Sequence, residues 1–546
     1  MKKTAGKKNV LDGIIVSDYG HDSLSATNAL RLKIGDSVGN IQEIHRLLNT
    51  IKGAPCSTGE KNIPSWDGAP KLNGIFLLSF LNKRKYSFEL INNYKLEQEK
   101  VKILAEMNPK FVLISTTFIY RKIDLLKLAK ELRETFKNSV IIVGGPFVYS
   151  SFLLMEKARI GGYQTAIASK DYLFLEIDEE PLVDFYVISP RGEHVLLELM
   201  RRVEDGGDFR GLPNIAQYKD GKYCFSDFQS ENCSGDQLSV DWNCLPESIF
   251  STKVVPVQAS NGCTYNCSFC NFTKSKKVNC VKSMDLLFSE LRQVQQKGVN
   301  YIWFSDDNFR LGKKDLKYFC QRMVDEKIAL KWMSFIRASS LTDMDMDLLK
   351  KSGCIEVQLG VESGSQEILN NMNKRASPDL YQKVIRGLLS NGIDCSCYFI
   401  IGFPGETEKT VAETLQFIKQ IEGLDAEGCL SWSIFPFILS PLSPIYEQRE
   451  RERYSLEGYM HQWQHKTMNS TKAKELIKKI YFGLEKSAPI YRGDNLDLLK
   501  IMGPEKKKQF FNKRHFLAKS MLRDKDAFDS NKKIAEVFKF LNDEKS

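Results

Sequence analysis

The chain lacks long apolar runs and contains little histidine. Its 546 residues include 6 histidines, and none of these lies between residues 73 and 193. No stretch reaches the roughly 18 consecutive apolar residues that a membrane-spanning helix needs. The apolar piece after the basic residues 1–8 is too short for a signal peptide. We therefore expect a cytoplasmic protein without a membrane span.

A disulfide framework and a nucleic-acid-binding stripe are also missing. The 13 cysteines are an odd number without paired spacing, which is typical of reduced thiols. The net charge of +10 is a mild excess for this length, and no basic stripe is interleaved with aromatic residues. We expect no nucleic-acid partner, and a nucleic-acid-modifying protein stays a third interpretation that the basic excess motivates.

Three cysteines form one short loop, with C-x3-C-x2-C spacing at Cys263, Cys267 and Cys270. Thiolates at this spacing can hold one iron–sulfur cluster, and a [4Fe–4S] cluster normally takes four cysteine ligands. Three ligands leave one iron open to bind something other than protein. A zinc site would need a fourth ligand, but no second C-x2-C follows and we assign no histidine pair to the loop. The spacing favours a cluster, with a zinc loop or unpaired core thiols as alternatives.

The cysteine loop lies near the start of a stretch, residues 254–446, in which apolar strands alternate with amphipathic helices. Polar residues or glycines follow each strand, where barrel-type α/β folds place their active sites. Six strands are predicted, at residues 254–259, 301–305, 331–335, 356–360, 396–401 and 431–435.

The motifs that follow these strands resemble those of radical S-adenosylmethionine (SAM) enzymes. Phe269 precedes the last cysteine, and the chain continues with Asp306-Asp-Asn-Phe, Gly360-Val-Glu-Ser-Gly-Ser-Gln and Gly402-Phe-Pro-Gly-Glu. The resemblance implies a partial (β/α)6 barrel, a [4Fe–4S] cluster on the three cysteines, SAM on the open iron, and an electron donor such as flavodoxin or ferredoxin.

The resemblance also implies which residues contact SAM. An acidic group would hold the amino group, an arginine would neutralise the carboxylate, polar groups would meet the ribose or the amino acid moiety, and glycines would let adenine lie against the backbone. Asp306 or Asp307 would be the acidic group, and Arg337 would be the arginine. Gln358, Glu362 and Ser363 would be the polar groups, and Gly402 and Gly405 would be the glycines. Singly, each has a structural alternative: a helix cap, a surface ion pair or a plain turn.

The preceding region predicts a doubly wound parallel sheet. Strands are expected at residues 74–81, 111–116 and 140–145, with helices at 87–107 and 122–136 between them. The order ending in Ile-Val-Gly-Gly-Pro resembles the Rossmann-like cobalamin-binding domain of one branch of the same family. Cobalamin would then lie at the strand ends, at Ser79, Ser115, Thr116, Gly144 and Gly145.

The cobalt would receive no histidine from this domain. The loop expected after the first strand, residues 82–86, contains none, and His21 is assigned no role. The alternative is a flavodoxin-like domain that holds no ligand.

The predicted fold class is therefore α/β, with a helical C-terminal region. The expected divisions are an N-terminal extension (1–72), the cobalamin-binding-like domain (73–230), a linker (231–253), the barrel (254–446) and the C-terminal region (447–546). The resemblance implies a cobalamin-dependent methyltransferase acting on an unactivated centre of a specialised metabolite or peptide. The alternative is a cyclisation or rearrangement without methyl transfer, and no catalytic side chain is assigned.

Overall fold

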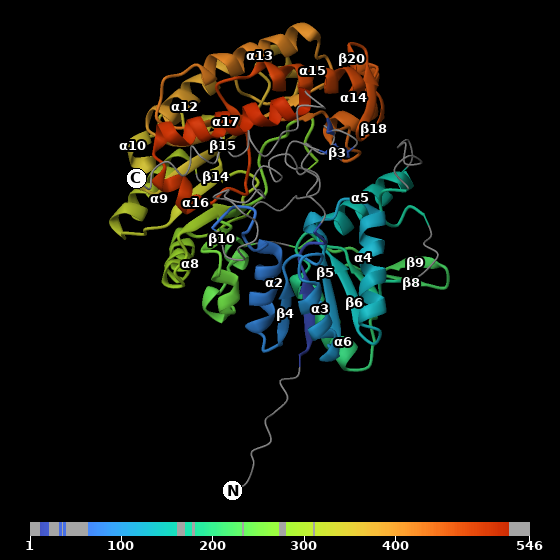
Figure 1. The fold of residues 1–546 in the computed structure, drawn as a ribbon. Helices are drawn as coiled ribbons and strands as arrows, with labels where there is room; N and C mark the ends of the chain where they lie inside the picture. The colour runs from blue at the N-terminus through green and yellow to red at the C-terminus, as the bar shows by residue number, and fades with distance from the viewer. Residues whose placement is uncertain are drawn as a thin grey trace. The chain divides into compact units, whose positions relative to one another are not determined.

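The chain forms two compact units, each built around its own seven-stranded sheet. The computed structural model describes residues 11–20, 32–34, 37–39, 64–160, 170–176, 181–231, 234–271, 280–309 and 312–523 (Figure 1). The first unit comprises residues 1–23 and 70–246, with 274–278, and the second comprises 24–69, 247–273 and 279–546. Within the described ranges, no helix combines the length and apolarity that a bilayer crossing requires.

The first unit has a mostly parallel sheet in the order β4-β1-β5-β6-β7-β8-β9, in which β8 runs antiparallel to both of its neighbours, β7 and β9. The parallel strands follow the flavodoxin-like order 2-1-3-4-5, whose ligand crevice lies between the first and third strands of the chain, here β1 and β5. The strands are β1 (Gly13–Val16), β4 (Phe88–Ile91), β5 (Phe111–Ser115), β6 (Val140–Gly144), β7 (Phe185–Val187), β8 (Ile215–Lys219) and β9 (Lys222–Phe225).

Helices cover both faces of this sheet. α2 and α6 are in contact with each other, and right-handed crossovers place the helices that follow β4, β5 and β6 on the opposite face. The helices are α2 (Leu72–Asn82), α3 (Gln98–Glu106), α4 (Lys122–Thr135), α5 (Pro146–Ile160) and α6 (Glu193–Glu204).

The start of the first unit corrects the sequence prediction. Residues 74–81, predicted as a strand, belong to helix α2, and the predicted helix at 87–107 contains strand β4 before α3 begins. The first strand is β1, which pairs with both β4 and β5 and so lies inside the sheet. The domain therefore begins before the predicted boundary at residue 73. An unbroken apolar run gives no period, so a buried helix and a buried strand look alike in sequence.

The second unit has an all-parallel sheet in the order β10-β13-β14-β15-β16-β17-β21. The six strands predicted for the barrel are all present. They are β10 (Val254–Val257), β13 (Tyr301–Phe304), β14 (Lys331–Phe335), β15 (Cys354–Glu362), β16 (Asp394–Ile401) and β17 (Leu430–Pro436); β21 (Ala488–Pro489) is a seventh.

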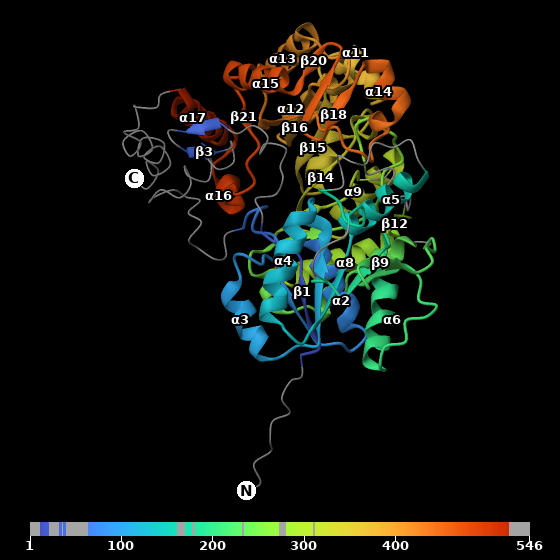
Figure 2. The same ribbon diagram turned by 90° about the vertical axis from the view of Figure 1, so that its right-hand side faces the viewer.

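Helices cover the outer face of the second sheet, with α12 against β16 and α15 against β16 and β17 (Figure 2). The apolar faces of these helices point to the strands, because their buried residues recur at helical spacing. The helices are α8 (Met284–Gln296), α9 (Lys313–Asp325), α10 (Met346–Lys351), α11 (Gln366–Asn371), α12 (Pro378–Ser390) and α13 (Glu408–Glu422), followed by α14 (Gln448–Tyr454), α15 (Ser470–Gly483), α16 (Leu496–Ile501) and α17 (Pro504–Arg523).

Short strands complete the second unit. The C-terminal region is helical as predicted, but it also contains a small antiparallel sheet that the sequence did not indicate. The short strands are β2 (Leu32–Ile34) paired with β3 (Ser37–Gly39), β11 (Ser260–Asn261) paired with β12 (Cys280–Val281), and the sheet of β18 (Glu457–Tyr459), β19 (Gln462–His465) and β20 (Met468–Asn469).

Residues between β1 and α2 enter the core of the second unit. Trp66 and Ala69 join a buried cluster with Val254, Tyr301 and Met333, and the Trp66 ring meets the Tyr301 ring edge-on at 6.2 Å. The chain thus leaves the first sheet after its first strand, contributes to the second unit, and returns.

Candidate active site

The cysteine loop leaves the carboxyl end of β10 and is fastened by backbone hydrogen bonds. The Cys270 amide donates to the Cys267 carbonyl at 3.1 Å, and the Ser268 amide donates to the Met372 carbonyl at 2.9 Å. The Asn373 side-chain amide donates to the Asn266 carbonyl at 2.8 Å. The segment after α11 therefore holds the loop in place.

The three cysteines differ in exposure. Cys267 is buried, whereas Cys263 and Cys270 are half-buried and none of the three is in a disulfide. In the part of the chain that the structure describes, no three His, Cys, Asp or Glu side chains gather around a single-ion position. The donor set is three thiols in one loop, which is the set that the C-x3-C-x2-C spacing predicted for a cluster with one open iron.

Two aspartates after β13 anchor the residues that lead into the first cysteine. Asp306 is buried, accepts hydrogen bonds from the Ser260 amide and hydroxyl, and accepts another from the Ala259 amide at 3.2 Å. Asp307 accepts from the Gly262 amide at 3.0 Å. Burial raises the pKa of Asp306 to about 7, against the lowering effect of these hydrogen bonds and of the Lys282 charge. These carboxylates position the loop backbone, and their predicted contact with the SAM amino group stays a prediction.

A buried ion pair lies beside the loop. Lys374 Nζ is 2.7 Å from Glu362 Oε1, and both side chains are about nine-tenths buried. The ammonium lies 5.8 Å from the centre of the Phe269 ring and interacts electrostatically with Cys267. Burial acts to lower the pKa of Lys374, but the charges of Glu362, Tyr381 and Cys267 and the hydrogen bond to Glu362 together outweigh it, so this pKa is raised.

The pair requires a glycine next to it. A Cβ on Gly360 would lie 2.5 Å from Glu362 Oε1 and 3.0 Å from Lys374 Nζ, so a side chain there would displace the pair. Glu362 itself has a left-handed backbone conformation, with φ of 70°. The Gly-Val-Glu-Ser motif thus shapes the backbone as well as supplying polar groups.

Arg337 also meets the cysteine loop. Its guanidinium lies 3.4 Å from the centre of the ring of Tyr265, a residue that lies between the first two cysteines in sequence. Arg337 Nη2 donates to the Lys374 carbonyl at 2.5 Å. The structure therefore brings Arg337, Glu362 and Lys374 to the same loop. Sequence reasoning assigned no role to Lys374, which lies eight residues after the Gly360–Gln366 motif.

Two other predicted SAM contacts are fully buried. Ser363 Oγ lies 3.1 Å from Thr414 Oγ1 and accepts from the Ser365 amide at 3.1 Å, so it fixes the turn against α13. Gln358 donates to the Met333 sulfur at 3.3 Å, and its Oε1 has no hydrogen-bond partner among the described residues. The register of β15 shifts between Gly360 and Glu362, so the regular alternation of side chains does not extend from Gln358 to Glu362.

The turn after β16 is packed under the small C-terminal sheet. Gly402 and Gly405 have φ of 95° and 93°, and a Cβ on Gly402 would lie 2.4 Å from the Trp463 ring. Buried Glu406 accepts from the Gly402 amide, and burial raises its pKa to about 8. His465 Nε2 lies 3.2 Å from the Gly402 carbonyl oxygen, and burial lowers the pKa of His465 to about 4.

In the first unit, the predicted cobalamin residues divide into two groups. Thr116 and Gly145 lie at the carboxyl ends of β5 and β6, where Thr116 Oγ1 donates to the Gly144 carbonyl at 2.9 Å and accepts from the Phe147 amide at 3.2 Å. Ser79, by contrast, lies inside α2 and accepts from the Asp241 amide at 2.9 Å, so its predicted position at a strand end is wrong.

The carboxyl ends of β1 and β5 bring together polar groups that sequence reasoning missed. Asn73 donates to the Ser17 carbonyl at 2.9 Å and to Ser115 Oγ at 2.8 Å. Asn73 Oδ1 and Ser17 Oγ are buried without a hydrogen-bond partner among the described residues. Unsatisfied polar atoms at a switch point fit a polar ligand there.

The loop after the first strand also changes with the strand assignment. It begins at Ser17, not at residue 82, and in sequence it includes His21. His21 lies outside the described residues. The prediction that no histidine follows the first strand therefore rested on the wrong strand.

The sequence model of the radical SAM superfamily matches residues 257–418, which run from the end of β10 into α13. Alternating strands and helices with a three-cysteine loop at the strand ends define the second unit as a radical SAM domain. This chain therefore carries a radical SAM domain.

Curated relatives with different activities match more of the chain. An uncharacterised methyltransferase of Pyrococcus horikoshii is 24% identical over 383 residues, which are 67% of this chain and 77% of the relative. The anaerobic magnesium-protoporphyrin IX monomethyl ester cyclase of Rubrivivax gelatinosus is 23% identical and is covered over 52% of its length. The bacteriochlorophyllide d C-12(1)-methyltransferase of Chlorobaculum tepidum is 26% identical and is covered over 54%.

Solved structures share the fold of both units. The cobalamin-dependent SAM radical enzyme OxsB, solved with aquacobalamin, matches 98% of this chain and 76% of its own, with a TM-score of 0.59 at 15% identity. The methyltransferase TsrM of Kitasatospora setae, solved with cobalamin and a [4Fe–4S] cluster, matches 80% of this chain and 77% of its own, with a TM-score of 0.53 at 16% identity. A Rossmann-like unit with a radical SAM barrel is therefore the architecture of this chain.

Proposed function

We propose that this protein is a cobalamin-dependent radical SAM methyltransferase that acts on an unactivated centre of a small metabolite or a peptide. The observation that carries the proposal is the cysteine loop, which lies beside the Glu362–Lys374 pair and Arg337. The first unit has a flavodoxin-like strand order, and buried polar atoms without a hydrogen-bond partner among the described residues lie at its switch point. Both features support the proposal that cobalamin binds there.

The chain's own residues bind and orient in this proposal. Asp306 and Asp307 hold the loop that presents the three thiols, and the Lys374 ammonium lies beside this loop, where it interacts electrostatically with Cys267. Arg337 would neutralise the SAM carboxylate, and Glu362 would accept from the ribose or the amino group. A bound cluster supplies the electron that cleaves SAM, and bound cobalamin carries the methyl group.

The proposal includes a soluble electron donor, a flavodoxin or a ferredoxin, and a reducing cytosol. The electron that reduces the cluster would come from this donor. Among the described cysteines, all but Cys280 are free thiols, which suits an oxygen-sensitive open cluster in a reducing compartment.

Anaerobic turnover with SAM and dithionite tests this function. A methyltransferase of this kind releases both 5′-deoxyadenosine and S-adenosylhomocysteine, and mass spectrometry should detect both products. Release of S-adenosylhomocysteine should require added cobalamin, and the Cys263→Ala/Cys267→Ala/Cys270→Ala variant should release no 5′-deoxyadenosine. Cobalamin-independent cleavage without S-adenosylhomocysteine would contradict methyl transfer.

A cyclisation without methyl transfer is the second candidate, because one relative is named as a cyclase. It would release 5′-deoxyadenosine without S-adenosylhomocysteine. The mass of its product would not show the 14 Da increase that methylation of the substrate gives. The same turnover experiment therefore separates the two candidates.

A further inference from the structure

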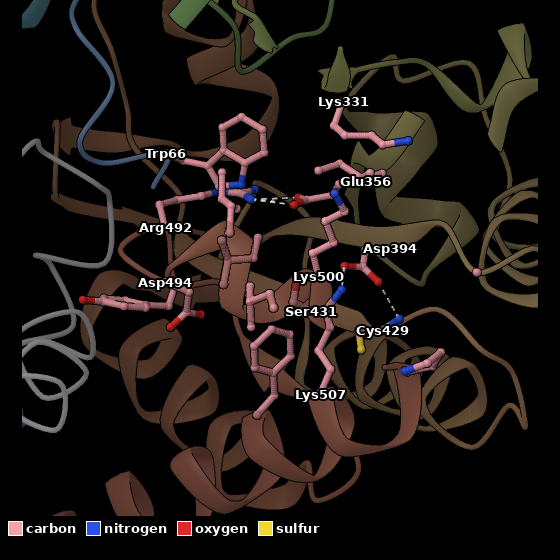
Figure 3. A pocket seen from close by; sticks show the side chains of 18 of the residues that line it. Trp66, Lys331, Glu356, Asp394, Cys429, Ser431, Arg492, Asp494, Lys500 and Lys507 are labelled. Atoms are coloured by element: carbon pink, nitrogen blue, oxygen red, sulfur yellow. Dashed lines mark hydrogen bonds and ion pairs between the residues drawn. The ribbon is translucent and has the colours of Figure 1, made fainter. Parts of the chain in front are cut away.

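The second unit contains a cavity at the end of its sheet opposite the cysteine loop. The cavity measures about 270 Å³, and its walls include the first residues of three strands, Tyr301, Lys331 and Asp394 (Figure 3). All strands of this sheet are parallel, so the cysteine loop, which follows the carboxyl end of β10, lies at the other edge. Seven residue steps along β16, at about 3.3 Å each, place the two edges roughly 23 Å apart.

Side chains fill the interior between this cavity and the active-site edge. The Tyr398 ring lies parallel to the Phe435 ring at 6.0 Å and approaches the Phe335 ring at 5.0 Å. Arg492 Nη2 donates to the Tyr398 hydroxyl at 3.2 Å, so this aromatic layer borders the cavity. The cavity is therefore separate from the cysteine loop, where the proposed radical chemistry would take place.

Positive charge exceeds negative charge in the cavity wall. Six lysine or arginine side chains line it, against four aspartates or glutamates. Three of the carboxylates are already paired, as Figure 3 shows for the pair between Arg492 and Glu356. The pairs are Arg492–Glu356 at 2.8 Å, Arg514–Asp494 at 2.5 Å and Lys507–Asp394.

The lysines left over from these pairs lie close to one another. Lys331 and Lys500 make no hydrogen bond or ion pair with any described residue, and Lys350 donates to the Gly392 carbonyl. Burial lowers the pKa of Lys331, and the charges of Lys500 and Lys350 lower it further. These cations repel one another in a partly buried wall. An anion that enters the cavity would offset this repulsion and so stabilise the folded chain.

The rest of the wall is apolar and aromatic. Trp66, Ile355 and Leu499 face the cavity, together with the rings of Tyr491 and Phe511. Small-molecule sites combine such a lining with a few polar groups that fix orientation, and this volume lies just below their usual range of about 300–1,000 Å³.

We propose that this cavity binds a small organic anion, with its phosphate or carboxylate on Lys331 and Lys500 and its apolar body against Trp66. The C-terminal segment that carries Tyr491, Arg492 and α16 closes the cavity over the strand starts. A bound anion would therefore fasten this segment to the sheet. The site is separate from the proposed methyl transfer and does not depend on it.

Isothermal titration calorimetry of the full, anaerobically reconstituted chain with phenyl phosphate and with phenylacetate tests the proposal. One of the two should bind with one site per chain, and its identity tells whether the anion is a phosphate or a carboxylate. Lys500→Gln should weaken this binding several-fold, and Lys331→Gln/Lys500→Gln should weaken it at least tenfold, because a charge-assisted hydrogen bond is lost at each lysine.

Lys314→Gln is the matched control, since Lys314 is exposed on α9 and lies outside the cavity wall. It should change the affinity by less than twofold. Lys500 is exposed, so its single variant should fold normally, with an unchanged thermal midpoint in the absence of ligand. Failure of both probes to bind, or equal binding by wild type and the double lysine variant, would overturn the proposal.

Discussion

At the residue scale, several polar side chains of the active-site motifs are committed to holding backbone. Asp306 pairs with the amides of Ala259 and Ser260, and Ser363 pairs with Thr414 and the Ser365 amide. A buried amide without a partner costs about 1–3 kcal/mol, so these side chains are required wherever the loop is buried. A motif match alone does not separate this role from contact with a ligand.

The Glu362–Lys374 pair gives a test of charge at the site. Lys374→Met leaves the Glu362 carboxylate buried and unpaired, so we expect a loss of about 3 kcal/mol or more in the free energy of unfolding. Glu362→Gln/Lys374→Met removes both charges and should restore most of that loss. Urea unfolding of the apo chain under anaerobic conditions measures both values.

Lys351→Met is the control for that experiment, because Lys351 forms an ion pair with Asp347 on the surface, with both side chains more than half exposed. Exposed pairs contribute at most about 1 kcal/mol, so this variant should change little. Equal losses in Lys351→Met and Lys374→Met would show that the buried pair has no special weight.

Glu406 gives a test of pH dependence. Burial raises its pKa to about 8 in the folded chain, above the ordinary glutamate value. A raised folded pKa means that the folded state holds the proton more tightly, so this group's contribution to stability is complete in acid and is lost as the pH rises toward 8. The contribution is on the order of a few kcal/mol.

Glu406→Gln keeps an oxygen that can accept from the Gly402 amide but cannot ionise. We expect its thermal midpoint to fall less than that of wild type between pH 5 and pH 8.5, as followed by circular dichroism. Parallel curves for the two proteins would mean that Glu406 ionises in the folded state as it does in water.

At the scale of elements, the two halves of the chain differed in how well sequence predicted them. The strands of the second unit were predicted because each apolar run ends in a polar motif that fixes its boundary. The first unit offered an apolar run at residues 74–81 that became helix α2, while the four-residue strand β1 was overlooked. Strands of this length carry little pattern of their own, and β1 is defined by its pairing with β4 and β5.

In the turn after β16, Gly402 leaves the space that the Trp463 ring of β19 occupies. Gly402→Ala should both strain a left-handed backbone and push a Cβ into the Trp463 ring. Gly298→Ala is the matched control, because Gly298 has φ of 74° but nothing within 4 Å of its added Cβ. The thermal midpoint should drop more for Gly402→Ala than for Gly298→Ala, and equal drops would mean that only the backbone conformation matters.

At the scale of the whole molecule, the two units carry separate parts of the proposed chemistry. The thiols and the Glu362–Lys374 pair belong to the second unit, and the β1/β5 crevice belongs to the first. Residues 64–69 connect the units in an unexpected way, since they follow β1 in sequence but Trp66 packs in the second core.

This separation predicts independent loading of the two units. The Cys263→Ala/Cys267→Ala/Cys270→Ala variant should contain no cluster iron but should bind cobalamin with an affinity within about threefold of wild type, as measured by the corrin absorption of the purified chain. Joint loss of iron and cobalamin in a folded variant would show that the first unit needs the cluster loop to hold its ligand.

The sequence by itself determined the reaction class, because three thiols at fixed spacing and the motifs after successive strands are local patterns in the chain. It also determined the parallel barrel, since strand and helix periods alternate in order. Tertiary structure alone decided that β1 lies inside the first sheet, that Lys374 lies beside Cys267, and that Lys331, Lys350 and Lys500 share one cavity. These relations join residues far apart in the chain, and burial and pairing across such distances leave no period in the sequence.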